Sequence, residues 1–250
     1  MQKFLIAAAS AVVVSSAHAQ FADSVVEFIP GSNVGAFDDP SSALGEPSRL
    51  TDSGGATTPF FAAADPSRLV TVGEGGSLTI AFASPVVDNP ASVQFGIDFL
   101  VFGNAFFFDD FSSPQGTPED PVATGVFAEG GSVEVSADGV NFFPLSGVAD
   151  GSFPTLGFTD PDPVLDIGFD GLDLPVGTTP TDFTIAVDPS LDPIGLSASE
   201  LIAAYDGSGG GAGFDFSSTG LSSIQFVRIT NPVGSGVTPE IDGFADVIPE

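Results

Sequence analysis

The sequence predicts an all-β protein, an antiparallel β-sandwich of jelly-roll type with long loops and one short helix. Apolar residues alternate with small or polar residues in short runs, which is the pattern of strands that bury one face. Glycine and proline, 31 and 21 of the 250 residues, punctuate those runs. A helical pattern occurs only once, so folds that need a helix after most strands are disfavoured.

Strands are expected wherever the alternation is clear. Residues 77–82 and 93–101 each place large apolar side chains on one face, and the glycine-rich turn 73–76 precedes the first of them. The remaining expected strands are residues 25–29, 133–136 and 141–143 joined as a hairpin by Asp138-Gly139, then 183–187, 224–230 and 241–247.

The single expected helix begins after Ser197. Ser197 and Glu200 have the spacing of a capping box, and the apolar residues 201–204 follow. Residues 106–121 and 150–181 are rich in turn-forming residues, so we expect long loops there, at the ends of the sandwich where binding sites tend to lie. Within the first, the run Phe106-Phe107-Phe108 is interpreted as a buried strand end, with an exposed apolar contact as the alternative.

The first 19 residues have the pattern of a secretory signal peptide. Lys3 supplies the positive charge, residues 4–14 are apolar, and residues 17–19 form an A-x-A cleavage site. Residues 20–250 are then expected to form a single domain, secreted or held at the cell surface. No later segment approaches the roughly 20 uninterrupted apolar residues of a membrane-spanning helix, so no membrane span is expected.

The composition excludes several classes of function. After residue 19 the chain has no Lys, His, Cys, Met or Trp. No base is left for Ser-His-Asp or Ser-Lys catalysis, and disulfides and thiolate metal sites are impossible. The net charge of −29 repels phosphate backbones, which excludes nucleic acid as a partner. Such a charge is expected of adaptation to saline surroundings, of cation binding, or of both.

Calcium is the expected cation, because it prefers carboxylate and carbonyl oxygens, whereas zinc prefers His and Cys. The densest candidate site is the glycine-rich segment 205–215, with Asp206 and Asp215 towards its two ends. Part of this segment matches one copy of the calcium-binding β-helix repeat, a fold that needs tandem copies. The alternative for the segment is a plain tight loop.

The last expected strand carries a second group of acids. Period-two alternation places Glu240, Asp242 and Asp246 on one face. We expect Glu240 and Asp242 to bind calcium and Asp246 to belong to a solvent-facing acidic edge that discourages aggregation. Arg228 is the alternative partner for these acids. The complete set of expected calcium ligands is Asp188, Asp192, Asp206, Asp215, Glu240 and Asp242.

Residues 99–107, 205–215, 226–230 and 240–247 resemble segments of exported bacterial cell-surface proteins that often carry a PEP-type C-terminal sorting tail. The resemblance implies an extracytoplasmic surface or matrix role and brings no catalytic residues. The family's tail continues beyond Pro-Glu-Pro with an apolar span and a basic end, whereas this sequence stops at Pro249-Glu250. We therefore expect either a released relative or a reading frame that ends early, and membrane sorting is not carried over.

Residues 133–142 are similar to a hairpin of discoidin-like, galactose-binding jelly rolls, which implies a structural calcium ion and a glycan-binding loop face without assigning residues to either. The resulting hypothesis is a non-catalytic, calcium-stabilised module that binds extracellular glycan or cell-surface matrix components. One alternative is a glycan hydrolase or lyase that uses two carboxylates about 5 to 9.5 Å apart. The other is a purely structural matrix protein.

Overall fold

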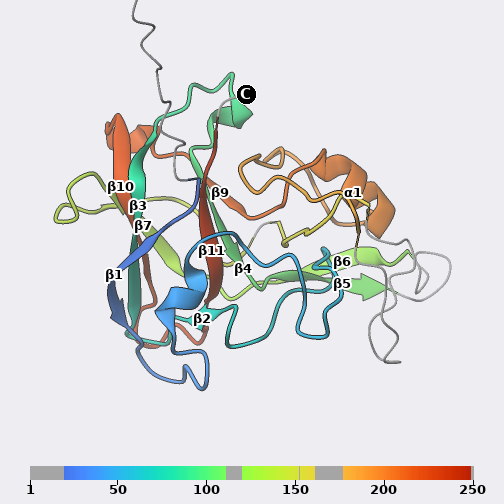
Figure 1. Cartoon of the computed structure of the whole chain (residues 1–250), viewed down its shortest axis with the longest axis horizontal. Helices are drawn as coiled ribbons and strands as arrows, with labels where there is room; N and C mark the ends of the chain where they lie inside the picture. Colours follow the sequence, from blue (N-terminus) through green and yellow to red (C-terminus); the bar gives the residue numbers. More distant parts are fainter. Residues whose placement is uncertain (1–19, 111–119, 152, 161–176, 249–250) are drawn as a thin grey trace, which may run out of the picture.

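The computed structural model describes residues 20–110, 120–151, 153–160 and 177–248. Within these residues the chain forms two larger antiparallel sheets, a separate two-stranded hairpin and a single α-helix, so the predicted all-β sandwich with one short helix is confirmed. Figure 1 shows the two sheets as adjacent layers, with the helix and the hairpin beyond the smaller one. The expected signal peptide lies outside the described residues.

The larger sheet has five strands in the order β1 (Ser24–Ile29), β3 (Ser77–Val87), β10 (Ser223–Thr230), β7 (Ser132–Ser136) and β8 (Phe143–Pro144). The smaller sheet has four strands in the order β2 (Val70–Thr71), β11 (Glu240–Asp246), β4 (Phe99–Gly103) and β9 (Ala212–Phe214). The remaining elements are the hairpin β5 (Phe106–Asp110) and β6 (Val122–Phe127), the helix α1 (Ala198–Tyr205), and the 3₁₀ turns η1 (Pro40–Ala43), η2 (Gln94–Gly96) and η3 (Ser217–Thr219).

The sandwich encloses one main hydrophobic core. Alternate residues of β3 are fully buried in it, as the period-two pattern predicted, and β4 contributes in the same way from the opposite sheet. The largest side chains at the centre are Leu78, Ile80 and Phe82 from the five-stranded sheet and Phe99, Phe214 and Phe244 from the four-stranded sheet. Phe99 and Phe214 stack with ring centroids 5.2 Å apart.

The other face of the four-stranded sheet is also buried. Leu100 and Phe102 of β4 belong to a second cluster, in which the rings of Phe102 and Phe183 meet edge to face at 5.1 Å. The expected strand at residues 183–187 is therefore wrong, because this run covers the sheet as irregular backbone. Its polar groups are satisfied locally: the Thr184 amide donates to Asp182 and the Ser208 hydroxyl donates to the Ile185 carbonyl.

Two other expectations need correction. The expected strand 93–101 begins only at Phe99, because Gln94 and Phe95 adopt positive φ angles of 45° and 62° within η2. The expected loop 106–121 contains strand β5, and residues 111–119 lie outside the described residues. Since neighbouring strand residues face opposite sides, Phe107 is buried while Phe108 is 49% exposed. The interpretation as a buried strand end holds for Phe107 only.

Helix α1 begins with the predicted capping box. The Ser197 hydroxyl accepts from the Glu200 amide at 3.4 Å, and the Glu200 carboxylate accepts from the Ser197 amide at 2.9 Å. Leu201 and Tyr205 bury one face of the helix. The helix ends at Tyr205, and its C-cap residue Asp206 takes the left-handed conformation (φ 48°).

We expect Ser197→Ala to lower the free energy of unfolding by about 1 kcal/mol, because the substitution removes the acceptor for an amide in the first turn. Urea denaturation monitored by circular dichroism measures the change. Ser218→Ala, at an exposed serine outside the helix, serves as the control. A loss at Ser197 no larger than at Ser218 would contradict the role of the cap.

Candidate metal centre

Three carboxylates meet at one end of the four-stranded sheet. Asp88, Asp98 and Asp215 each offer one carboxylate oxygen, and these three oxygens all lie within 4.8 Å of one another. In the part of the chain that the structure describes, no other three potential metal-ligating side chains are grouped this closely. We call these three residues the Asp98 cluster.

The strand order explains the meeting of these residues. Asp98 precedes β4 and Asp215 follows β9, and because the two strands are antiparallel neighbours, the start of one lies beside the end of the other. The Asp98 amide donates to the Phe214 carbonyl at 2.8 Å. Asp88 follows β3 of the other sheet. The cluster therefore joins both sheets of the sandwich.

Asp98 forms the buried floor of the cluster. Its side chain is fully buried, with Oδ1 accepting from the Asn89 amide at 2.6 Å and Oδ2 from the Phe216 amide at 2.8 Å. Burial, with smaller contributions from the charges of Asp215 and Asp88, raises the pKa of Asp98 to about 6 against these two hydrogen bonds. An ionised carboxylate has about four lone-pair directions, so each oxygen can still accept another partner. Asp88 and Asp215 are exposed at the rim.

Asp246 lies close to this cluster and corrects an expectation. It is only 8% exposed, and burial, followed by the charge of Asp98, raises its pKa to about 7. The expected solvent-facing acidic edge is wrong, because β11 lies between β2 and β4 in the sheet. A register shift between Ile241 and Gly243 also breaks the simple alternation, so that Ile241 and Phe244 both enter the main core.

The glycine-rich segment 205–215 does not bring its two acids into one group. Asp206 is the exposed last residue of the α1 cap, whereas Asp215 belongs to the Asp98 cluster. The glycines between them allow close packing: a Cβ on Gly209 would lie 2.1 Å from a Phe183 ring carbon, and a Cβ on Gly210 would lie 2.3 Å from the Pro154 carbonyl oxygen. Tight packing is therefore sufficient to explain these glycines.

The other expected ligands have different surroundings. Asp188 accepts from the amide and hydroxyl of Ser190, and Asp192 accepts from the Ile194 amide, so both stabilise exposed turns. Asp242 is buried and accepts from Ser48 through both carboxylate oxygens, at 2.8 Å each. Glu240 is partly buried beside Asn104, which donates its side-chain amide to it.

Sequence reasoning thus found one member of the Asp98 cluster, Asp215, and missed Asp88 and Asp98. The available signal was position: each acid flanks a strand, at the end of residues 77–87 or at the start of residues 99–103. Arg228, the alternative partner for the expected acids, instead forms an ion pair of 2.7 Å with Glu134, its neighbour across β10 and β7.

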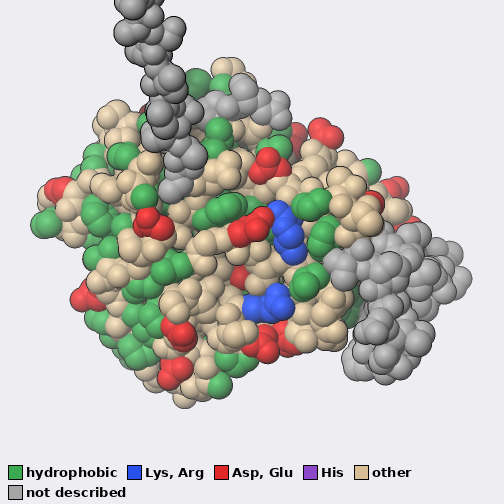
Figure 2. All heavy atoms as spheres, viewed as in Figure 1, with side chains coloured by type: hydrophobic (Ala, Val, Ile, Leu, Met, Phe, Trp, Pro, Cys, Tyr) green, Lys and Arg blue, Asp and Glu red, His purple; other side chains and the backbone are tan. Residues whose placement is uncertain are grey.

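Other acids of the described residues lie apart from the Asp98 cluster. Figure 2 shows carboxylate side chains spread singly or in small groups over the visible face. This distribution is what solvated surface charge produces.

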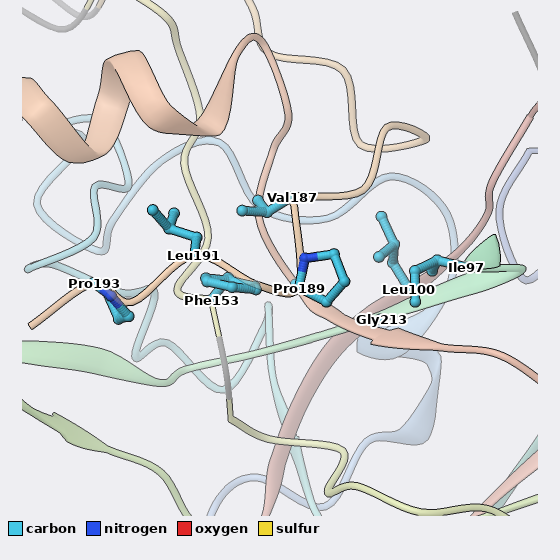
Figure 3. Close-up of a pocket in the computed structure, with 9 residues that line it drawn as sticks. Ile97, Leu100, Phe153, Val187, Pro189, Leu191, Pro193 and Gly213 are labelled. Carbon is cyan, nitrogen blue, oxygen red and sulfur yellow. The ribbon is translucent and has the colours of Figure 1, made fainter. Parts of the chain in front are cut away.

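A pocket of about 290 Å³ opens on the face of the four-stranded sheet away from the main core. Figure 3 shows Ile97 and Leu100 at one side and Val187, Pro189 and Leu191 along the covering loop. The residues that line it have apolar side chains or are glycines. None of these lining side chains is a carboxylate or a carboxamide, the side chains that would orient a sugar or perform acid and base catalysis.

The fold and the cluster define an antiparallel β-sandwich with a carboxylate site that joins its two sheets. Comparison with known families and with curated proteins found no match for this chain. In the described residues, no helix has both the length and the apolar character needed to cross a membrane.

Proposed function

We propose that the protein is an exported, non-catalytic module at or outside the cell surface, and that Ca²⁺ bound at the Asp98 cluster stabilises it. The observation that carries this proposal is the convergence of three carboxylate oxygens within 4.8 Å. Calcium takes roughly six to eight oxygen ligands and often includes water among them. Asp98 supplies a fixed buried ligand, while the exposed Asp88 and Asp215 leave space for water.

The charges supply the energetic reason for a cation. Asp98 and Asp246 are both buried and repel each other, and the exposed pair adds two further charges at short range. A divalent ion offsets this repulsion locally, whereas dissolved salt screens buried pairs only weakly. Because Asp215 lies more than 100 positions after Asp88 and Asp98, the ion links segments that separate on unfolding.

Glycan is the ligand class that we propose for the module. Its support is the aromatic surface on the β5–β6 hairpin, where the rings of Phe106, Phe108 and Phe127 lie 5.0 to 6.5 Å apart by centroid. Such rings offer flat faces on which sugars stack. The apolar pocket is not part of this proposal.

A glycan hydrolase or lyase is the second candidate, because a carboxyl group with a pKa of about 6 beside another carboxylate is the arrangement used for acid and base catalysis. The burial of Asp98 disfavours it, since a catalytic acid must reach the glycosidic oxygen. Binding on a glycan array without product release supports the module. Release of sugar that is lost in Asp98→Asn supports the enzyme. If the protein neither binds a glycan nor releases sugar, the purely structural matrix protein is the remaining hypothesis.

Calcium is expected to raise the melting temperature relative to chelator at equal ionic strength, because a ligand of the folded state at 100 times its Kd adds about 2.7 kcal/mol to the free energy of unfolding. Calorimetric melts of Asp215→Asn are expected to lose the part of this shift that comes from the Asp98 cluster. Asp192→Asn, at an exposed turn that asparagine also accommodates, is the matched control. An unchanged shift in Asp215→Asn would move the calcium site elsewhere.

A further inference from the structure

A second group of acids lies at the end of β4 where it meets the start of β11. Glu129, Asp150 and Glu240 lie close enough that the charge of Glu129 raises the pKa of both other acids and Glu240 raises that of Asp150. Gly103 makes this approach possible, since a Cβ there would lie 2.5 Å from Asp150 Oδ1 and 2.6 Å from the Glu240 carbonyl oxygen. We call the three acids together with Asn104 the Asp150 cluster.

Two oxygens of the Asp150 cluster are buried without a hydrogen-bond donor. Asp150 is fully buried, and its Oδ1 accepts from the Ala105 amide at 3.0 Å, but Oδ2 has no partner. The Glu240 backbone amide is close enough to favour the ionised form, yet it makes no hydrogen bond of ordinary geometry to Oδ2. Asn104 donates its amide to Glu240 and leaves its own Oδ1 unpaired.

These unpaired oxygens are costly. A buried acceptor without a partner costs about 1 to 3 kcal/mol, and more when it is charged. Reversing the Asn104 amide does not help, because its oxygen would then face the Glu240 carboxylate. The two ion pairs of the described residues, Arg49 with Glu46 and Arg228 with Glu134, do not involve this cluster. No ion pair of the described residues therefore satisfies these oxygens, and the partner they lack is a cation, a proton or a water molecule from the solvent.

We propose that the Asp150 cluster is a second Ca²⁺ site, with the unpaired Asp150 Oδ2 and Asn104 Oδ1 as its inner ligands. Its three carboxylates are not grouped as closely as those of the Asp98 cluster, so Glu129 and Glu240 must each move one carboxylate oxygen inward when the ion binds. Carboxylate and carboxamide oxygens are the ligands that calcium prefers over softer metals. The Thr238 hydroxyl donates a hydrogen bond to Glu129 Oε1 at 3.0 Å, so Glu129 Oε2 is the oxygen that would bind the ion. The site shares no residue with the Asp98 cluster and goes beyond the function proposed above.

A proton is the rival occupant, because burial raises the pKa of Asp150 to about 7. A shared proton would satisfy the same oxygens without metal. At pH 8, above this pKa, the two cases differ: a calcium site binds one more ion per chain, whereas a cluster that only takes up and releases a proton binds none. The discriminating measurement is therefore the number of calcium ions bound at pH 8.

Isothermal titration of the chelator-stripped protein with CaCl₂ at pH 8 is expected to give two ions per chain. Glu129→Gln is the main variant, because Glu129 is only partly buried and the fold tolerates its change better than that of Asp150. We expect it to weaken one of the two sites at least tenfold. Glu27→Gln, at an exposed strand residue, is the matched control and is expected to keep both sites.

The outcomes separate this proposal from the previous one. Loss of one site in Glu129→Gln and of the other in Asp215→Asn supports both, and the double variant then binds no calcium. Wild-type binding in both Glu129→Gln and Asp150→Asn overturns the second site, even where Asp215→Asn still removes the first. A single ion in the wild type that Asp215→Asn abolishes also overturns it. Should Asp150→Asn fail to fold, Glu129→Gln decides alone.

Discussion

Acidification from pH 8 to pH 5 is expected to stabilise the calcium-free protein by at least about 3 kcal/mol, the contribution of one buried acid whose pKa lies near 7. Burial raises the pKa of Asp150, Asp242 and Asp246 to about 7 and that of Asp98 to about 6. These values lie above the unfolded-state pKa of about 3.9, so the folded state binds more protons in this range. The stability linked to each proton is present at low pH and is lost as the pH rises through about 6 for Asp98 and about 7 for the other three acids.

The magnitude follows from the same linkage. One buried acid changes the free energy of unfolding by up to about 1.4 kcal/mol per pH unit between its two pKa values. The total is smaller than the sum over four acids, because a proton on Asp98 or Asp246 relieves the repulsion on the other. General repulsion at a net charge of −29 acts in the same direction, and salt screens that part selectively.

Acids with lowered pKa values set the pH below which further acidification destabilises the protein. Hydrogen bonds, first from the Thr178 hydroxyl and then from the Thr179 amide, lower the pKa of Asp160 to about 2. The acids whose pKa is lowered in a similar way are Asp39, Asp65, Glu74, Asp138 and Asp188. Their contribution is present above an unfolded pKa of about 4 and is lost below it. Stability is therefore expected to peak near pH 5.

Urea denaturation in chelator, at fixed ionic strength and at each pH unit from 4 to 8, measures this profile. Asp242→Asn is the informative variant, because asparagine can still pair with the Ser48 amide and hydroxyl but cannot titrate. We expect it to be more stable than the wild type at pH 8 and to show a shallower pH dependence. Asp192→Asn is expected to leave the profile unchanged. A wild-type protein that loses stability between pH 8 and pH 5 would contradict the raised pKa values.

Calcium is expected to flatten the same profile. Bound carboxylates must be ionised, so calcium competes with protons and stabilises more at pH 8 than at pH 5. The Asp98 and Asp150 clusters contribute to this difference, whereas Asp242 belongs to neither cluster and is paired with Ser48. Repeating the pH series in calcium with Asp242→Asn therefore separates the titration of a buried acid from the binding of metal.

Sequence alone was sufficient where the determining interactions are local. The capping box of α1 involves residues three apart, and the hairpin turn after β7 is fixed by Asp138, which accepts from the Val140 and Asn141 amides. The strands β3 and β10 were predictable because each buries alternate residues against a single core. These features require no knowledge of which strands become neighbours.

The candidate site could not be predicted because it depends on strand order. Asp98 and Asp215 are more than 100 positions apart and meet only because β4 pairs with β9. Likewise, the surroundings of Glu240 were hidden until β11 was placed beside β4, with Asp150 reaching the same point from a loop. The prediction of a strand at residues 183–187 was wrong for a related reason. A segment that lies flat over a buried sheet face produces the same alternating pattern as a strand.

Replacing Gly73 by alanine is expected to lower the free energy of unfolding by about 3 kcal/mol, the upper end of the usual cost of overpacking. A Cβ at this position would lie 1.9 Å from the Ser32 carbonyl oxygen. The obstacle is backbone, which cannot turn aside as a side chain can. The segment around Gly31 and Ser32 is equally close to Gly73, since a Cβ on Gly31 would lie 2.4 Å from the Gly73 carbonyl oxygen.

The substitution tests a contact that joins the end of β1 to the turn before β3, where the Gly73 amide donates to the Pro30 carbonyl at 2.8 Å. Gly55→Ala is the matched control, because its nearest neighbour beyond the adjoining residues is the Thr51 hydroxyl at 3.6 Å and neither glycine has a positive φ. Chemical denaturation of both variants isolates the steric cost from the general effect of replacing glycine. Equal stabilities would mean that the two backbone segments do not approach each other in solution. A selective loss at Gly73 would show that the glycines of turn 73–76, which the sequence marks only as a turn, are also required for packing against β1.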